Sequence, residues 1–216
     1  MRITAKIKNE MISRLEKIYH DTKSALNFNN PFELLVAVIL SAQCTDVRVN
    51  VTTGRLFKKA ATPEAILSLG LDGLEEEIRD CGLFRNKAKN IMKTCQKLHD
   101  DYADQVPSDY DELLSLPGVG RKTANVVSSI AFGRPAIAVD THVFRVSNRL
   151  KLAVGNSPEE VEKKLQKAIP VEKWSAAHHW LIWHGRKICK ARHPLCQKCP
   201  LNDLCPSASL LETPIA

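Results

Sequence analysis

Residues 116–140 read LPGVGRKTANVVSSIAFGRPAIAVD, and the helix-breaking proline and glycines of this stretch decide the fold. Pro117 ends one helical pattern, and Gly118 and Gly120 give the backbone the conformational freedom that a tight turn needs. Apolar residues at helical spacing then resume, and Gly133 stops the second helix. The stretch therefore predicts two helices joined by a glycine hairpin.

The start of the second helix carries the first candidate for chemistry. Free backbone N–H groups and the positive end of the helix dipole suit a phosphate oxygen there. Lys122 lies in the first turn, and a neutral lysine amine is a nucleophile. The Lys122–Arg121 pair equally fits a solvated surface beside an ordinary helix–helix turn, because lysines are mostly exposed. The spacing alone leaves both interpretations open.

Two tracts resemble one known family. Residues 116–127 resemble the helix-hairpin-helix of the endonuclease III family of DNA glycosylases, and VDTHVFRV at 139–146 resembles the segment that follows it there. The resemblance runs from about residue 31 to residue 205 and so covers most of the chain. It implies that Lys122 attacks the sugar of the damaged nucleotide and that Asp140 assists. Asp140 also precedes a helical pattern, where an N-cap is its commonest role, and the two roles can coexist.

The composition is that of a globular protein that binds a polyanion. The 216 residues are 44% hydrophobic and 25% charged, enough to form one domain or two small ones. The net charge is +7, which favours a polyanionic partner. Much of this charge lies between residues 173 and 202, where six lysines and arginines occur without one acidic residue.

The sequence shows no sign of export or membrane insertion. Its start lacks an apolar signal segment, and the longest apolar run, at 34–40, is too short to span a bilayer. We therefore expect a cytoplasmic, nucleoid-associated protein that is monomeric and has no membrane partner.

Helical spacing recurs along the chain and strand-like alternation is scarce, so we predict an all-α fold. Asn30 and Glu33 form a predicted capping box ahead of an apolar run, which indicates a buried central helix. Asp72 and Glu75 predict another capping box, and Ser108 is predicted to cap the helix that leads into the hairpin.

Four of the seven cysteines cluster near the C-terminus with the spacing C-x6-C-x2-C-x5-C: Cys189, Cys196, Cys199 and Cys205. Four thiolates in so short a loop can hold one metal centre, whereas disulfides are disfavoured in a reducing compartment. Zinc remains an alternative because four thiolates suit it as well. The spacing resembles the iron–sulfur loop of the endonuclease III family, which implies a structural [4Fe–4S] cluster held by loop 189–205. The other cysteines are interpreted as small core residues: Cys44, Cys81 and Cys95.

The same resemblance implies which residues contact DNA. Gln43 would enter the space left by an extruded base, and Leu83 would intrude into the duplex opposite it. From the sequence alone, Leu83 after a helix end is an ordinary packing residue. The hairpin and the basic part of the cluster loop are implied to grip phosphates: Gly118, Val119, Gly120, Arg121, Lys190, Arg192 and His193. The lesion pocket is implied to include Ser41, Asp46, Thr141 and His142.

The fold and function implied by the resemblance are specific. Two helical domains would flank a DNA-binding cleft: residues 24–134 as a six-helix barrel with its helix-hairpin-helix at 108–132, and residues 1–23 with 135–216 as the cluster domain. The implied protein is a bifunctional DNA glycosylase/AP lyase of base excision repair. It would remove oxidised pyrimidines from double-stranded DNA, act at abasic sites, and cleave the strand 3′ to the abasic site by β-elimination through a lysine Schiff base.

Three other functions fit the sequence less well. A non-enzymatic DNA-binding module would explain the hairpin and the charge, but not the pairing of Lys122 with Asp140. Adenine-mismatch glycosylases of the same superfamily usually carry a further C-terminal domain and lack the lysine nucleophile. An electron-transfer protein would use the cluster but would leave the tract Ser41-Ala42-Gln43 unexplained.

Overall fold

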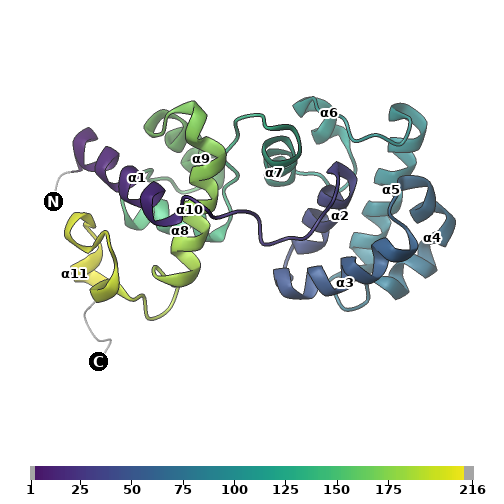
Figure 1. Ribbon diagram of the computed structural model, residues 1–216, viewed down its shortest axis with the longest axis horizontal. Helices are drawn as coiled ribbons and strands as arrows, with labels where there is room; N and C mark the ends of the chain where they lie inside the picture. The colour runs from purple at the N-terminus through teal and green to yellow at the C-terminus, as the bar shows by residue number, and fades with distance from the viewer. Residues whose placement is uncertain (1–2, 212–216) are drawn as a thin grey trace. The chain divides into compact units, whose positions relative to one another are not determined.

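The computed structural model describes residues 3–211, and the regular structure in this range is helical throughout (Figure 1). The all-α prediction is therefore confirmed. Residues 1–2 and 212–216, which the sequence assigns to the cluster domain, lie outside the described residues. None of the helices between residues 3 and 211 combines the length and the apolar character that crossing a lipid bilayer requires.

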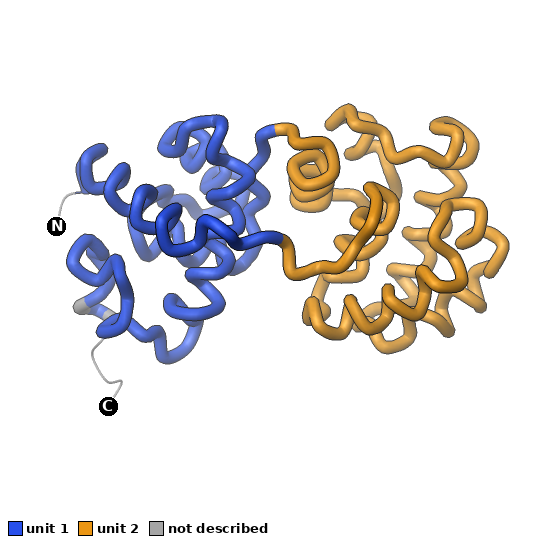
Figure 2. Tube along the Cα trace, in the orientation of Figure 1, with its two compact units in different colours: residues 1–23, 135–216 blue, residues 24–134 orange. Residues whose placement is uncertain are grey.

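The chain divides into two compact units, which Figure 2 colours separately: unit 1 is residues 1–23 and 135–216, and unit 2 is residues 24–134. The helices of unit 2 are α2 (Pro31–Ser41), α3 (Asp46–Lys59), α4 (Pro63–Glu77), α5 (Phe84–Tyr102), α6 (Tyr110–Ser115) and α7 (Arg121–Phe132). Those of unit 1 are α1 (Ala5–Tyr19), α8 (Thr141–Arg149), α9 (Pro158–Ala168), α10 (Trp174–Lys187) and α11 (Ala208–Leu211). Unit 1 also contains three short 3-10 helices, η1 (Val171–Lys173), η2 (Cys196–Lys198) and η3 (Asn202–Leu204).

Helix α2 forms the centre of unit 2. Residues 32–40 are all buried, and α3, α5 and α7 pack around them. Burying one leucine or isoleucine side chain contributes about 1.5–3 kcal/mol, so this helix supplies much of the hydrophobic stabilisation of the unit. Its start agrees with the sequence, because the Asn30 side chain accepts a hydrogen bond from the Glu33 backbone N at 2.9 Å. The Glu33 carboxylate accepts from the backbone N of Asn29 at 2.7 Å, one residue earlier than in a standard capping box.

Two predicted helix starts in unit 2 are wrong. The chain between 63 and 77 breaks at Gly70, which has a φ of 70°, rather than at Asp72. Glycine adopts this left-handed conformation without steric cost, so the backbone kinks there. The cap of α6 is Asp109, whose carboxylate accepts from the backbone N of residues 111 and 112. Ser108 instead accepts a hydrogen bond from Arg134 at 3.3 Å, a contact between segments 26 residues apart.

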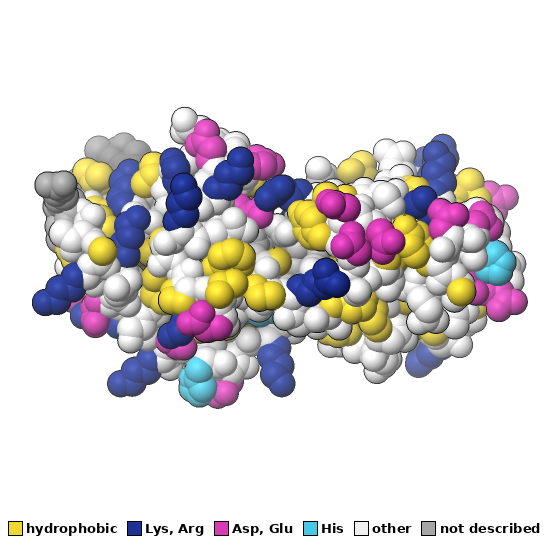
Figure 3. Space-filling view, turned by 90° about the horizontal axis from the view of Figure 1, so that it is seen from above, with side chains coloured by type: hydrophobic (Ala, Val, Ile, Leu, Met, Phe, Trp, Pro, Cys, Tyr) yellow, Lys and Arg dark blue, Asp and Glu magenta, His cyan; other side chains and the backbone are white. Residues whose placement is uncertain are grey.

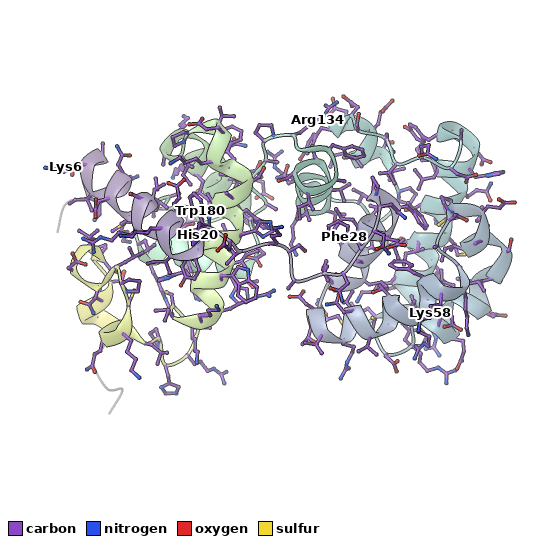
Figure 4. All side chains as sticks on the ribbon, in the orientation of Figure 1. Lys6, His20, Phe28, Lys58, Arg134 and Trp180 are labelled. Carbon is purple, nitrogen blue, oxygen red and sulfur yellow. The ribbon has the colours of Figure 1, made fainter. Side chains whose placement is uncertain are left out.

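The core of unit 1 is formed where α1, α8 and α10 pack together. Trp180 of α10, labelled in Figure 4, is buried in it. His184 is buried as well, and its Nδ1 lies 3.2 Å from the Tyr19 hydroxyl of α1. His178 Nδ1 lies 2.8 Å from the backbone oxygen of Ala138. These contacts tie α10 to α1 and to the segment that leads into α8.

The stability of unit 1 should depend on the protonation of His179. Burial, with a smaller contribution from His178, lowers the pKa of His179 from 6.5 to about 4. The folded state therefore holds the neutral imidazole. This preference stabilises the fold fully at pH values above the pKa of His179 in the unfolded chain, and the stabilisation is lost as the pH falls towards its pKa in the folded protein. We expect the free energy of unfolding to drop by about 1–2 kcal/mol from about pH 7 to about pH 5 through this residue.

The measurement is urea unfolding followed by tryptophan fluorescence, because all three tryptophans, Trp174, Trp180 and Trp183, lie in unit 1. His179→Gln should reduce the pH dependence, and the part that remains should come from His184, whose pKa burial also lowers to about 4. His20→Gln, at the exposed position labelled in Figure 4, should leave it unchanged. Equal pH slopes for the two variants would contradict this assignment.

Candidate nucleic-acid and iron–sulfur site

The predicted hairpin is present in unit 2 between α6 and α7 and is held against α5. Within the turn, the backbone N of Val119 donates to the oxygen of Leu116 at 3.1 Å. The Thr94 hydroxyl of α5 donates to the Pro117 oxygen at 2.5 Å. Gly118 has a φ of 75°, and a Cβ there would lie 2.7 Å from the Cβ of Asn90. The turn therefore requires glycine at 118 for both its conformation and its close approach to α5.

The N-terminus of α7 faces outward directly after this turn. Gly120 occupies the N-cap position, so no side chain caps the helix. The amides of the first turn and the helix dipole together make such a terminus suited to an anion. Arg121 and Lys122 are exposed there, and Val119 is buried beneath them. The structure thus provides an uncapped helix start that is suited to an anion, with an accessible amine two residues after the cap position.

Two neighbouring segments of unit 2 carry the residues predicted to displace a base. Gln43 follows α2 with a φ of 51°, and Leu83 precedes α5 with a φ of 59°. Leu83 is 57% exposed, so it is not the packing residue that its position after a helix end indicates. A Cβ at Gly82 would lie 3.2 Å from the backbone oxygen of Gln43, which shows how closely the two segments approach. The structure therefore brings Gln43 and Leu83 together.

The predicted pocket residues of unit 2 lie on either side of Gln43. The Ser41 hydroxyl donates to the oxygen of Val38 at 2.8 Å in the last turn of α2. Asp46 is half-buried in the first turn of α3. Both side chains therefore lie at helix ends that meet at the Gln43 segment.

Lys87 is a buried cation beside this segment that the sequence analysis did not identify. It is 5% exposed and donates a 2.8 Å hydrogen bond to the oxygen of Leu40 at the end of α2. Burial lowers the pKa of its ammonium group, and the nearby thiols of Cys81 and Cys44 act in the opposite direction. In the sequence, the position of Lys87 four residues before the buried Ile91 indicates that both lie on the apolar face of α5.

In unit 1, Asp140 stands at the start of α8. Its Oδ1 accepts a hydrogen bond from the backbone N of Val143 at 2.7 Å, so the predicted N-cap role is confirmed. Thr141 is exposed, and His142 is half-buried with its Nδ1 3.2 Å from Nη2 of Arg145. Burial lowers the pKa of His142, while the charge of Asp140 raises it. The tract therefore places a carboxylate, a hydroxyl and a largely neutral imidazole at one helix start.

The other end of α8 holds the cluster loop. Arg145 donates from Nε and Nη2 to the oxygen of Cys189, both at 3.1 Å. Arg149, one turn later, donates to the oxygens of Lys190 at 2.6 Å and Ala191 at 3.0 Å. Guanidinium groups suit this task because they present several donors in a fixed plane. The sequence analysis missed both arginines, although their spacing of four residues indicated a shared helix face.

Because the arginines hold the backbone of the loop, its basic side chains extend outward. Lys190, Arg192 and His193 are all exposed, and His193 has a φ of 49°. The face of the molecule in Figure 3 shows lysine and arginine side chains spread over unit 1. Unit 1 thus carries exposed cations that can meet a phosphate backbone.

The four clustered cysteines suit an iron–sulfur cluster. All are free and half-buried. Burial, with smaller contributions from the nearby sulfurs of Cys205, Cys189 and Cys196, raises the pKa of the Cys199 thiol to about 11. Four thiolates can coexist there when bound iron supplies compensating positive charge, and Arg149 adds a donor to the Cys189 sulfur at 3.6 Å.

Family models match both parts of this site. Residues 36–171 match the HhH-GPD superfamily of base excision DNA repair proteins. Residues 189–205, which include all four clustered cysteines, match the iron–sulfur binding domain of endonuclease III.

Curated proteins and solved structures agree with these models. The chain is 54% identical to endonuclease III of Rickettsia felis over 202 residues, which are 93% of this chain and 94% of that protein. It is 52% identical to endonuclease III of Escherichia coli K12 over 196 residues, covering 91% and 93% of the two chains.

Two solved structures are similar in fold. The structure of a trapped endonuclease III–DNA covalent intermediate superposes with a TM-score of 0.93 at 52% identity, covering 97% of this chain and 99% of that chain. A thermostable thymine-DNA glycosylase gives a TM-score of 0.85 at 25% identity, with coverage of 95% and 98%.

The turn geometry predicts different effects for the two hairpin glycines. Gly118→Ala should lower the free energy of unfolding by about 1–3 kcal/mol, because a left-handed φ is strained for alanine and its Cβ would press on Asn90. Gly120→Ala should lower it by less, about 0.5–1 kcal/mol, since its φ is −92° and no atom lies within 4 Å of the added Cβ, so only the poorer capping by alanine counts.

Urea unfolding followed by far-ultraviolet circular dichroism measures this difference. Tryptophan fluorescence, which reports unit 1, is the internal control and should change less in both variants. Equal destabilisation by the two substitutions would show that the turn tolerates a side chain at 118.

Proposed function

The chain belongs to the endonuclease III family within the HhH-GPD superfamily, and from this membership we propose which of its residues carry out each step of base excision repair. It is a DNA glycosylase and AP lyase with a [4Fe–4S] cluster. The observation that carries the residue assignment is the exposed Lys122 in the uncapped first turn of α7, directly after the phosphate-binding hairpin.

We propose that Lys122 is the nucleophile. Its neutral amine attacks C1′ of the deoxyribose, the bond from C1′ to the base breaks, and the base leaves with that electron pair and takes up a proton. The nitrogen and C1′ then form a Schiff base as the sugar ring opens. The similar structure of a trapped endonuclease III–DNA covalent intermediate supports this order of events.

Asp140 is the proposed partner of this lysine. Its Oδ1 accepts the hydrogen bond from Val143, which fixes the carboxylate and leaves the second oxygen for the reaction. That carboxylate positions the lysine or takes a proton from its ammonium group, and in its ionised form it stabilises the positive charge that develops on the sugar. Loss of a proton from C2′ of the Schiff base then expels the 3′ phosphate, which cleaves the strand by β-elimination.

The DNA contacts follow from the geometry of each segment. The backbone at 118–121 and the side chains of Lys190, Arg192 and His193 bind phosphates without reading sequence. Gln43 and Leu83 hold the duplex open after a nucleotide leaves the stack, which costs a few kcal/mol. The lesion pocket that receives the base is proposed to be lined by Ser41, Asp46, Thr141 and His142.

The substrate and assembly are proposed as follows. The enzyme acts as a monomer on double-stranded DNA that contains an oxidised pyrimidine or an abasic site. Loss of aromaticity in an oxidised pyrimidine weakens its stacking, which lowers the cost of extrusion. The residues of the cluster loop hold the [4Fe–4S] cluster, which stabilises that loop. We expect the protein to act in the cytoplasm at the nucleoid.

Replacement of the proposed nucleophile should remove covalent chemistry and spare DNA binding. Lys122→Gln should give no borohydride-trapped adduct with a duplex that carries one abasic site, because glutamine cannot form a Schiff base. Lys93→Gln, which removes another exposed lysine of unit 2, should trap like the wild type. A full yield of adduct from Lys122→Gln would show that a different amine attacks the sugar.

The capping and catalytic roles of Asp140 should separate in two variants. Asp140→Asn keeps an oxygen for the Val143 N–H and removes the charge, so it should retain stability and lose about 10²-fold or more in base excision rate. Asp140→Ala should lose the same activity and about 1 kcal/mol of stability as well. Single-turnover excision and urea unfolding measure the two effects, and wild-type excision by Asp140→Asn would leave the residue with a capping role only.

A further inference from the structure

Two cysteines outside the cluster form a pair in unit 2. Cys81 is 1% exposed, and its thiol donates to the Thr52 hydroxyl at 3.7 Å. Its second neighbour is the half-buried Cys44, whose side chain is a hydrogen-bond partner of Cys81. Cys95 on α5 differs, because its raised pKa of about 12 comes from burial and from Asp104 rather than from another thiol. Cys81 and Cys95 are buried core residues as the sequence predicts, whereas Cys44 is only half-buried.

The backbone around the two thiols is also in close approach. A Cβ at Gly82 would lie 3.2 Å from the oxygen of Gln43, so the residue after Cys81 meets the residue before Cys44. Cystine bridges form where the Cα atoms of two residues come within about 7 Å and their thiols face each other. The interaction of the two thiols and the close approach of the adjacent backbones place Cys44 and Cys81 next to one another.

A buried cation lies beside the pair. The ammonium group of Lys87 favours the thiolate form of Cys81, although burial has the larger effect and raises the pKa of that thiol. Lys87 is held in place by its 2.8 Å hydrogen bond to the oxygen of Leu40. Cys44 is the more accessible thiol and is therefore oxidised first. Cys81 is the thiol that then reacts with the oxidised sulfur of Cys44.

We propose that Cys44 and Cys81 are a redox modification site that closes to a reversible disulfide and ties the Gln43 segment to the Leu83 segment. Hydrogen peroxide oxidises Cys44 to a sulfenic acid with release of one water molecule. The Cys81 sulfur then attacks the Cys44 sulfur, the S–O bond breaks, and a second water molecule leaves. The net reaction consumes two thiols and one peroxide, and a dithiol reductant reverses it.

The bridge restricts residues that the proposed function places in the DNA. Gln43 adjoins Cys44, and Leu83 lies two residues after Cys81, so a bond between the cysteines limits how far the two side chains can separate. This consequence rests on the proposed function, whereas formation of the disulfide does not. Oxidised protein should excise a base about 10-fold more slowly while it still binds duplex phosphates through the hairpin.

Peptide mapping tests the bond on the full-length, cluster-containing protein. After treatment with dilute hydrogen peroxide and alkylation, trypsin should release peptides 24–48 and 80–85 as one species that separates on reduction, because each contains a single cysteine. Cys44→Ser and Cys81→Ala should not give this species, and the matched variant Cys95→Ala should give it. Full alkylation of Cys44 and Cys81 after peroxide treatment would overturn the proposal. Loss of the visible absorbance of the cluster before the linked peptide appears would overturn it as well.

Base-excision assays test whether the Cys44–Cys81 disulfide slows the reaction, which is separate from whether the disulfide forms. With a duplex containing one oxidised pyrimidine, peroxide-treated wild type and Cys95→Ala should slow and recover with dithiothreitol, whereas Cys81→Ala should be unaffected. A linked peptide without any change in excision would uphold the thiol pair and overturn the assigned role of Gln43 and Leu83. Slower excision without a linked peptide would show that Cys44 and Cys81 do not form the disulfide, and it would leave the proposed roles of Gln43 and Leu83 in place.

Discussion

Burial of helix α2 is the constraint on which the DNA-facing side of unit 2 depends. Because residues 32–40 are buried on every side, α2 can have one position only within the surrounding helices. Gln43 follows its C-terminus, α7 packs against it, and Lys87 fixes its last turn to α5. Hydrophobic burial of one helix thus positions the hairpin and the segments of Gln43 and Leu83 that are proposed to displace a base.

Helix α8 has the corresponding role in unit 1, but it acts through polar contacts. Its first residue follows Asp140, and its last turns hold the backbone of the cluster loop through Arg145 and Arg149. The loop is rich in lysine and arginine, and such a segment has little apolar surface with which to fold by itself. Guanidinium donors, and the packing of Leu201 and Leu204 with the core of unit 1, supply the contacts that hold the loop.

The sequence predicted features that depend on local pattern and missed those that depend on distant contacts. The all-α fold and the caps Asn30 and Asp140 were predictable because each depends on residues within one helical turn. Ser108 and Asp109 are both residues that cap helices well, and the sequence does not reveal the contact with Arg134 that engages Ser108 elsewhere. Likewise, the two arginines, Lys87 and the Cys44–Cys81 pair each contact residues more than 30 positions away. The role of Lys122 came from the family resemblance, since an exposed lysine at a helix start has no distinctive spacing.

Backbone strain gives a last argument about where function lies. Among the described residues, six non-glycine residues have a positive φ, and four of them lie just after helix ends, where a left-handed residue closes the helix: Gln43, Ala103, Asp104 and Lys151. The other two, Leu83 and His193, lie before a helix or in an irregular segment, and each is a proposed DNA contact. A left-handed conformation at such a residue costs on the order of 1 kcal/mol, which packing elsewhere must offset. Because Leu83 is 57% exposed, the packing of its own side chain offsets little of this backbone strain energy. The strain therefore favours a role for these side chains outside the fold, in contact with a partner.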